Sequence, residues 1–238
     1  MVKHHHLVSV LIPAYNERAR LPSTLQALWS TGKVDEIIVV DDGSQDQTGV
    51  IAEAWGAKVI RFEHNQGKGR ALSVGLAFTR GESVLLVDAD LQESAAQTIR
   101  LLEPIRQGEA DLAIAVFPRQ EAGKGFGLAR KTAQLGIKYL TGTVVHAPLS
   151  GQRAAKKEVF QNLLPFSGGF GIEVGMYIDA LRKGYRIMEI PLLVSHCPPG
   201  RDWAGFLHRG KQFGQICLAL STRLLQSKTR FTPQEEGK

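Results

Sequence analysis

Four short apolar runs, separated by segments with helical spacing of apolar residues, occupy the first ninety residues of the chain. The runs cover residues 8–12, 36–40, 58–62 and 84–87, and each contains valine or isoleucine. Strands that are apolar along their length are buried on both faces, which is typical of a parallel sheet between helices. The alternation predicts an α/β fold with a mostly parallel, twisted, doubly wound sheet and right-handed crossovers.

Beyond residue 92 the pattern is looser, and the individual elements are predicted one by one. Helices are expected over residues 95–106, 128–140 and 173–181, with a short one around residues 159–160, strands over 111–116 and 187–194, and a turn over 148–154.

Polar residues follow three of the first four predicted strands. Tyr-Asn-Glu occupies residues 15–17, Asp-Asp occupies residues 41–42, and Asp-Ala-Asp occupies residues 88–90. The carboxyl ends of parallel strands meet at one edge of the sheet, where open α/β folds bind ligands. These side chains are therefore expected to form one site.

Asp88 and Asp90 are candidate ligands of a divalent cation. In an extended chain both carboxylates project the same way, and Gln92 continues the alternation with a neutral oxygen. Adjacent carboxylates repel each other unless a cation lies between them, and Mg²⁺ and Mn²⁺ prefer oxygen ligands. Solvated acids in a turn are the alternative that the pair alone leaves open.

A basic, glycine-rich loop over residues 64–70 contributes Lys68 and Arg70. Cations for phosphates and carboxylates for a metal together describe a site for a nucleoside diphosphate. The sequence lacks a Walker loop and a nucleophile elbow, and Pro13 stands where a dinucleotide fingerprint would place a glycine-rich turn. Those three chemistries are therefore disfavoured.

The bulk properties narrow the class of partner. A net charge of +6 favours anionic partners. Scattered basic residues and only 7% aromatic residues argue against nucleic acid. Two isolated cysteines argue against a disulfide framework, and no apolar run is long enough to span a membrane, so a cytoplasmic location is expected.

Four motifs, in order, resemble family 2 glycosyltransferases of the GT-A fold. They are VLIPAYNE (residues 10–17), VVDDGSQDQT (39–48), NQGKG (65–69) and DADLQ (88–92). Their joint order and spacing carry the resemblance, which covers residues 7–195, and the last motif is most similar to polyprenyl-phosphate (dolichol-phosphate type) sugar transferases. The resemblance implies a GT-A-type Rossmann-like sheet flanked by helices, a nucleotide-sugar donor and Mg²⁺ or Mn²⁺.

Carried over position by position, the resemblance implies a donor site and a metal site. The implied donor-binding residues are Pro13, Tyr15, Glu17, Asp42, Lys68, Arg70 and Asp88. The implied metal ligands are Asp88, Asp90, Gln92 and His196, the last of which follows the final predicted strand. Asp90 and Glu173 are the implied catalytic residues, with Glu173 as a base for a hydroxyl acceptor.

The acceptor half departs from the family pattern. Ser-Gly-Gln-Arg-Ala at residues 150–154 resembles the family's Ser-Gly-Phe-Arg-Ala, with Gln152 in place of the aromatic residue. Lipid-phosphate members carry an acid just before this segment, where Pro148-Leu149 stand here. The residues expected to bind the acceptor are Arg119, Arg130, Lys131, Ser150 and Arg153.

The implied activity is a metal-dependent, inverting hexosyltransferase that uses UDP-glucose or GDP-mannose. Polyprenyl phosphate at the inner face of the membrane is the expected acceptor. A soluble transferase to a small phosphorylated acid such as phosphoglycerate is the alternative, and a non-catalytic nucleotide-binding module is an alternative of another class. The sequence leaves the oligomeric state open.

The expected organisation is one domain with a tail. Residues 1–6 are expected to be a disordered N-terminus or a tag remnant, and residues 7–200 a GT-A domain with a nucleotide-sugar-binding half (7–92) and an acceptor half (93–200). Residues 201–238 are predicted to form a basic amphipathic helix and tail. Such a helix covers its own core or lies on an anionic membrane, and self-packing is favoured.

Overall fold

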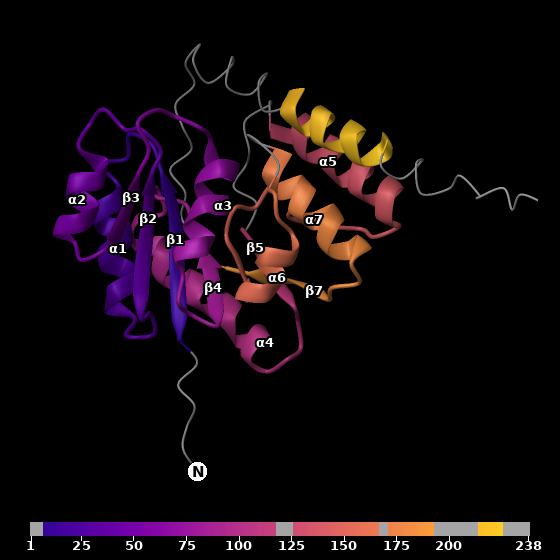
Figure 1. Cartoon of the computed structure of the whole chain (residues 1–238). Helices are drawn as coiled ribbons and strands as arrows, with labels where there is room; N and C mark the ends of the chain where they lie inside the picture. The colour runs from indigo at the N-terminus through magenta and orange to yellow at the C-terminus, as the bar shows by residue number, and fades with distance from the viewer. Residues whose placement is uncertain (1–6, 118–125, 167–170, 193–213, 226–238) are drawn as a thin grey trace, which may run out of the picture.

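A seven-stranded mixed sheet runs through the molecule in the computed structural model, which describes residues 7–117, 126–166, 171–192 and 214–225 (Figure 1). Its strand order is β3-β2-β1-β4-β6-β5-β7. The strands are β1 (Val8–Ala14), β2 (Glu36–Asp41), β3 (Lys58–Arg61), β4 (Ser83–Leu86), β5 (Leu112–Val116), β6 (Arg153–Lys156) and β7 (Ile187–Pro191). Only β6 runs antiparallel to its neighbours, β4 and β5. The predicted α/β fold with a mostly parallel sheet is therefore confirmed.

Helices flank both faces of this sheet. They are α1 (Leu21–Ser30), α2 (Thr48–Ala54), α3 (Lys68–Phe78), the 3₁₀ helix η1 (Gln92–Leu101), α4 (Leu102–Arg106), α5 (Phe126–Thr141), α6 (Lys157–Asn162) and α7 (Ile172–Arg182). A further helix covers residues 214–225. None of the helices in the described ranges combines the length and apolarity that crossing a bilayer requires.

Strand β1 shows how the sheet separates two hydrophobic cores. Val10 and Ile12 pack with Leu25 of α1 on one face, and Leu11 packs with Leu76 of α3 on the other. These side chains are at most 1% exposed. Burial on both faces, at about 1.5–3 kcal/mol per large side chain, explains why the strands read as continuous apolar runs.

Two predictions for the chain beyond residue 92 need correction. The helix expected over residues 95–106 is a 3₁₀ helix up to Leu101, followed by the short α4, whose first turn tolerates Pro104 because an amide there has no helical partner. The turn expected over residues 148–154 leads into β6, which begins at Arg153. Strand β6 escaped prediction because its four residues contain only two apolar side chains, both alanine.

The helix of residues 214–225 packs beside α5 and α7 (Figure 1). A Cβ added to Gly136 of α5 would lie 2.5 Å from a methyl carbon of Leu220, so glycine is what lets the two helices approach. Arg223 forms an ion pair with Asp179 of α7. The described part of the tail therefore packs on the domain.

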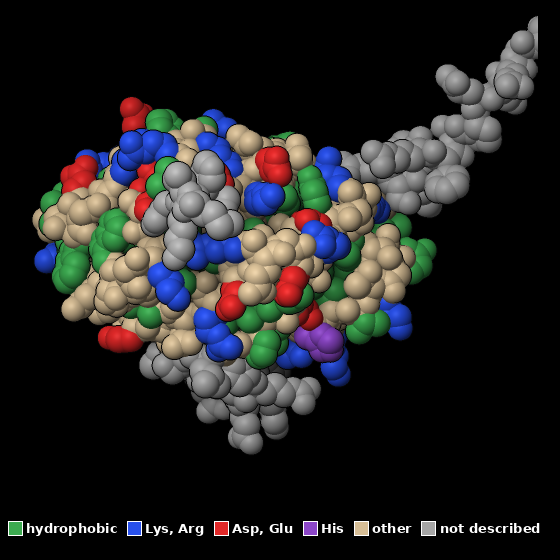
Figure 2. Space-filling view, turned by 90° about the horizontal axis from the view of Figure 1, so that it is seen from below, with side chains coloured by type: hydrophobic (Ala, Val, Ile, Leu, Met, Phe, Trp, Pro, Cys, Tyr) green, Lys and Arg blue, Asp and Glu red, His purple; other side chains and the backbone are tan. Residues whose placement is uncertain are grey.

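The face at the amino ends of the parallel strands carries mixed charge. Figure 2 shows this face, with positive and negative side chains interspersed over it. An interspersed surface has no single-sign field to attract a phosphorylated ligand. The opposite edge of the sheet, where the strands end, is the place to look for the site.

Candidate active site

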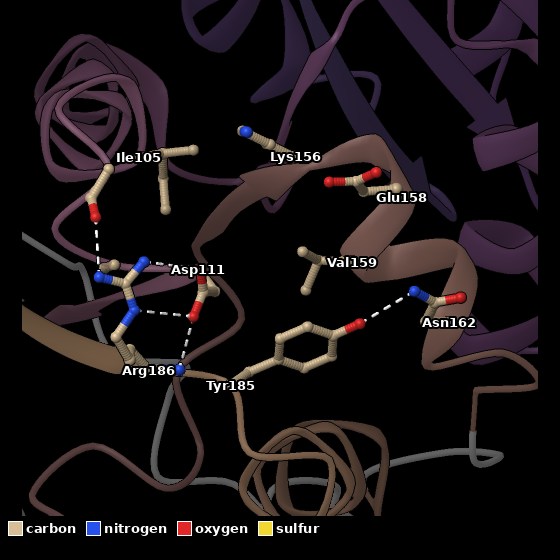
Figure 3. Close-up of a pocket in the computed structure, with 10 residues that line it drawn as sticks. Ile105, Asp111, Lys156, Glu158, Val159, Asn162, Tyr185 and Arg186 are labelled. Carbon is tan, nitrogen blue, oxygen red and sulfur yellow. Dashed lines mark hydrogen bonds and ion pairs between the residues drawn. The ribbon is translucent and has the colours of Figure 1, made fainter.

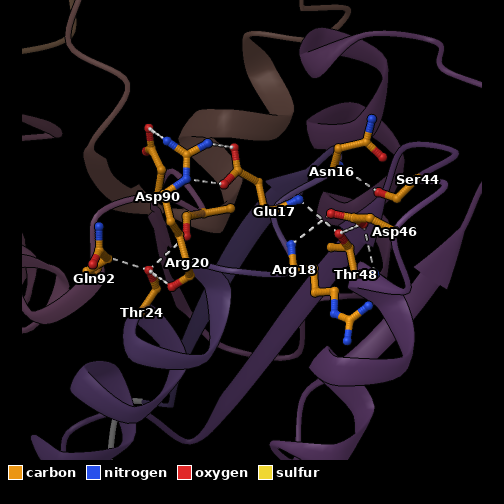
Figure 4. Close-up of polar contacts among 11 residues, drawn as sticks. Asn16, Glu17, Arg18, Arg20, Thr24, Ser44, Asp46, Thr48, Asp90 and Gln92 are labelled. Atoms are coloured by element: carbon orange, nitrogen blue, oxygen red, sulfur yellow. Dashed lines mark hydrogen bonds and ion pairs between the residues drawn. The ribbon is translucent and has the colours of Figure 1, made fainter. Parts of the chain in front are cut away.

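The loops that follow β1 and β2 are hydrogen-bonded to each other (Figure 4). Three successive backbone amides, of residues 16–18, donate to side-chain oxygens of Ser44, Thr48 and Asp46 at 3.0, 2.9 and 3.1 Å. Burial would raise the pKa of Asp46, but hydrogen bonds from Thr48 and from backbone amides outweigh it and lower that pKa. These contacts place Glu17 at the carboxyl edge of the sheet.

Arg20 bridges two of the predicted site carboxylates (Figure 4). Its guanidinium donates to both oxygens of Glu17 at 2.8 and 2.7 Å, and its Nη1 lies 3.7 Å from Oδ2 of Asp90. Burial raises the pKa of Glu17, and the charge of Arg20 opposes that rise. Sequence reasoning missed Arg20, although a cation three residues after a site acid was a usable signal.

Thr24 of α1 fixes the backbone of the Asp-Ala-Asp segment. Its hydroxyl donates to the carbonyl of Ala89 at 2.8 Å and accepts the amide of Gln92 at 2.8 Å. Residues 89–90 form a turn, and Gln92 has a φ of 50°. The expectation that an extended chain points three side chains the same way is therefore wrong, because the chain turns directly after Asp88.

Lys68, the first residue of α3, joins two acids from distant parts of the chain. Its Nζ lies 2.6 Å from Oδ1 of Asp88 and 2.9 Å from Oε1 of Glu173, which is the second residue of α7. Burial opposes the charge on Lys68, but the two carboxylates outweigh burial and raise its pKa. The structure thus brings together Lys68, Asp88 and Glu173 as a charged cluster at the predicted edge of the sheet.

Gln152 completes the surroundings of Asp88. Its Nε2 donates to Oδ2 of Asp88 at 2.7 Å, and its side chain is buried. A Cβ on the neighbouring Gly151 would lie 2.5 Å from Asp88 Oδ2 and 2.7 Å from Lys68 Nζ, so only glycine permits this approach. Gln152 departs from the family pattern in the sequence, and in the structure its side chain is hydrogen-bonded to Asp88.

We expect Gln152→Glu to weaken donor binding and to make it depend on pH. A carboxylate at this position would face Asp88, and like charges at this distance raise the pKa of one of them. The KM for the nucleotide sugar should rise about tenfold between pH 5 and pH 8 relative to the native protein. Steady-state kinetics across pH measure this, with Gln161→Glu on the exposed side of α6 as control. If the KM of the variant depends on pH in the same way as the KM of the native protein, this role of Gln152 is contradicted.

Asp42 holds the loop that presents Lys68. Its carboxylate accepts the amides of Gln66 and Gly67 at 2.7 and 2.8 Å, and the side chain is almost fully buried. Gly43 has a φ of +77°, and a Cβ there would lie 2.6 Å from the backbone of His64. The loops after β2 and β3 are thus locked together, and contact between Asp42 and a donor stays a prediction.

Arg153 is buried next to the site and donates hydrogen bonds to two backbone carbonyls there. It is 1% exposed, and its Nε and Nη2 donate to the carbonyls of Ser150 and Glu173 at 3.0 and 2.9 Å. The guanidinium also lies 5.8 Å from the ring centre of Tyr177. Its Nη1 is buried and has no hydrogen-bond partner within the described residues, and contact between Arg153 and an acceptor stays a prediction. Ser150 is buried as well.

Glu189 of β7 anchors the loop that leads to Gln152. Its carboxylate accepts the amides of His146 and Ala147 at 2.9 and 2.8 Å, and the Tyr177 hydroxyl at 3.0 Å. Burial raises the pKa of Glu189, but these hydrogen bonds outweigh it and lower the pKa overall. Sequence reasoning missed Glu189 because an acid inside a predicted strand belongs to no motif.

The remaining predicted residues lie around this cluster or outside the described ranges. Tyr15 is 45% exposed after β1, Pro13 lies within β1, and Arg70 is exposed on α3. Arg130 and Lys131 lie on α5, whereas the side-chain partners of Lys68 within the described residues are Asp88 and Glu173. Arg119 and His196 fall on residues that the structure does not describe.

A hollow of about 360 Å³ lies at the opposite edge of the sheet (Figure 3). Two of its charged groups are paired with each other, since Arg186 donates to both oxygens of Asp111 at 2.9 and 3.1 Å. These hydrogen bonds lower the pKa of Asp111. Tyr185 accepts a hydrogen bond from Asn162 at 2.9 Å. Paired groups at the amino ends of β5 and β7 do not favour this hollow as the site.

The family model described as Glycosyl transferase family 2 matches residues 9–170. The chain belongs to this family. The match contains the loops after β1 and β2, Lys68, the Asp88–Asp90 segment and Gln152, so the polar cluster lies largely inside the family domain.

Two curated relatives of the family 2 chain act on different acceptors. Glucosyl-3-phosphoglycerate synthase of Mycobacterium tuberculosis is 33% identical over 200 residues, which cover 74% of this chain and 61% of that protein. Undecaprenyl-phosphate 4-deoxy-4-formamido-L-arabinose transferase of Pseudomonas paraeruginosa is 30% identical over 200 residues, which cover 80% and 57%. The match thus spans about three-fifths of the length of these relatives.

Solved structures of the mycobacterial synthase share the fold. Its complex with Mg²⁺ and UDP has a TM-score of 0.78 at 31% identity and covers 92% of this chain and 79% of that one. Its complex with Mn²⁺, UDP-glucose and phosphoglyceric acid has a TM-score of 0.76 at 31% identity and covers 92% and 79%. The expected GT-A Rossmann-like fold is confirmed.

Proposed function

We propose that this protein transfers a hexosyl group from a UDP-hexose to a phosphate-bearing acceptor, with Mg²⁺ or Mn²⁺ as cofactor. The observation that carries the proposal is the Lys68–Asp88–Glu173 cluster at the carboxyl edge of the sheet, with Asp90 exposed beside it. The complexes of the mycobacterial synthase with UDP and Mg²⁺ or Mn²⁺ support the same donor and metal for this chain.

The residues present fit a divalent cation bound through oxygen. Asp90 is 41% exposed, and its ion pair with Arg20 is long at 3.7 Å, so its carboxylate is available to a hard cation. No group of three or more His, Cys, Asp and Glu residues suited to a metal occurs within the described ranges. Asp90 would hold the ion together with His196 and the donor diphosphate. When bound, the ion would neutralise charge on the leaving diphosphate.

Lys68 would bind a phosphate oxygen of the donor, and Glu173 would act on the acceptor. An ammonium group has three donors, and Asp88 and Glu173 occupy two of them, which leaves the third for a phosphate oxygen. Glu173 is 11% exposed and would accept the proton of a hydroxyl acceptor. A phosphate acceptor is already anionic and would need positioning rather than a base. Inversion at the anomeric carbon stays a prediction.

The acceptor phosphate could come from two sources. A small phosphorylated acid corresponds to the mycobacterial relative, and a polyprenyl phosphate corresponds to the Pseudomonas relative. The second acceptor would be reached at the inner face of a membrane. A cytoplasmic location stays the expectation for both.

A donor and acceptor panel tests the proposed function. The full chain is incubated with UDP-glucose or GDP-mannose, with 3-phosphoglycerate or a short-chain polyprenyl phosphate, and with Mg²⁺, Mn²⁺ or EDTA. We expect UDP release that requires a divalent cation and rises with one of the two acceptors. Absence of metal-dependent turnover or binding with every donor would contradict the proposal, and binding without turnover would favour the non-catalytic alternative.

A further inference from the structure

Large apolar side chains are exposed on two neighbouring helices, α5 and the helix of residues 214–225. The five most exposed ones, here called the two-helix face, are Leu128 (65%), Leu135 (68%) and Tyr139 (80%) on α5 and Leu218 (66%) and Leu225 (66%) on the second helix. Single exposed leucines are ordinary, but a cluster of this kind marks an interaction surface.

The spacing within each helix turns these side chains to one side. Leu128 and Leu135 are seven residues apart, as are Leu218 and Leu225, and a separation of seven is two turns. The opposite sides of the helices are buried: Ala133 and Ile137 of α5 pack in the core. The apolar stripe of each helix is therefore exposed to solvent, and the two helices lie next to each other in the fold (Figure 1).

Positive charge without acid accompanies the apolar stripes. The exposed Lys131 and Lys138 lie three residues after Leu128 and Leu135, on the same side of α5. No Asp or Glu occurs between residues 121 and 158 or between residues 202 and 235, although the chain contains 23 acids among 238 residues. Both helices thus come from acid-free stretches of the sequence.

Charge distinguishes between the two obvious occupants of this face. In a two-fold contact with a second copy, the same patch meets itself, so lysines would face lysines with no acid on either helix to pair with them. An anionic bilayer complements both features, because leucines enter the acyl boundary while lysines remain among negative headgroups. Helix α5 thus has the apolar and basic pattern of a helix that lies on a membrane surface, and the helix of residues 214–225 adds exposed leucines next to it.

We propose that the two-helix face docks on an anionic lipid bilayer. The docking goes beyond the transfer reaction, since it holds whether the acceptor is a lipid or a small phosphorylated acid. It assigns to α5 a role in addition to covering the core.

Vesicle sedimentation with the full chain tests the docking. We expect binding to vesicles of phosphatidylglycerol and phosphatidylcholine, weak binding to pure phosphatidylcholine, and loss of binding in high salt. The double variant Leu128→Ser/Leu135→Ser and the variant Lys138→Glu should each lower the partition coefficient about tenfold. Matched controls are Val50→Ser on α2 and Lys33→Glu, both at exposed positions outside the face.

The following outcomes would overturn the proposal that this face docks on an anionic bilayer. Equal binding to neutral vesicles, or binding unaffected by the face variants, would show that this surface is not an anionic-lipid site. A stable dimer that the double leucine variant dissociates would make a second copy the occupant, and preferential binding to duplex DNA would make the surface a nucleic-acid site. Metal-dependent UDP release measured without vesicles separates failure of docking from failure of the proposed function, because the double leucine variant should retain that release.

Discussion

Replacing Asp90 with asparagine should lower metal-dependent UDP release by on the order of 10²–10³-fold. The substitution keeps the shape of the side chain but removes the anionic oxygen that would bind the cation, so the charge developing on the diphosphate loses its counterion. The fold should be unaffected, because the Asp90 side chain is 41% exposed and its ion pair with Arg20 spans 3.7 Å. The rate of UDP release, measured as a function of Mn²⁺ concentration, tests this expectation.

The matched control for Asp90→Asn is Glu93→Gln. Glu93 is an exposed acid in the first turn of η1, close in the chain to Asp90, so the control removes the same charge without touching the site. Native dependence on Mn²⁺ in the Asp90 variant, or an equal loss in the control, would remove the metal role from Asp90.

Replacing Lys68 with methionine should weaken both donor binding and the folded state. The change leaves Asp88 and Glu173 without the cation that lies 2.6 and 2.9 Å from them. Because Lys68 is 30% exposed, water compensates part of the loss, and we expect destabilisation of about 2 kcal/mol, or roughly 5 °C in Tm. The KM for the nucleotide sugar should rise at least tenfold if the third ammonium donor binds a phosphate.

The pH dependence of this variant has a defined sign. In the native protein the pKa of Lys68 is raised, so its stabilisation is present below the ordinary lysine pKa and is lost only as the pH rises through the raised value. The deficit of the variant should therefore be complete at neutral pH and shrink only as the pH rises above the ordinary lysine pKa, where the native protein loses the contribution of Lys68.

Thermal unfolding from pH 7 to about pH 11, above the ordinary lysine pKa, measures this sign, with Lys183→Met as an exposed control and Lys68→Arg as the variant that keeps the charge. A Tm deficit that does not change with pH would show that Lys68 contributes packing rather than charge. An unchanged Tm and an unchanged KM together would refute the bridging role.

The parallel half of the sheet was predictable because both of its faces are buried. Strands β1, β2 and β4 read directly as apolar runs, and their polar ends predicted a common edge. Strand β6 was not predictable, because its two alanines give no periodic signal and its pairing with β4 joins residues some seventy positions apart. A local pattern of apolar residues indicates that a segment is buried, but it does not indicate which distant strand pairs with it.

The site was predictable only in part for the same reason. The motifs named Lys68, Asp88 and Glu173 separately, whereas the contact between Lys68 and Glu173 crosses 105 residues of sequence. Gln152 and Glu189 gained roles only through contacts with Asp88 and with the loop before Gln152. The burial of Arg153 and its hydrogen bonds to two backbone carbonyls likewise became visible only in the fold.

The sequence by itself determined the family, the parallel α/β core and the edge at which the acids gather, because these follow from local periodicity and from motifs read along the chain. Only the tertiary structure decided the direction of each acid: the turn at residues 89–90 separates Asp88, which faces Lys68 and Gln152, from Asp90, which faces Arg20. It also placed α5 against the helix of residues 214–225, each from an acid-free stretch of the sequence. Such contacts are set by packing between distant segments, whose geometry no local pattern contains.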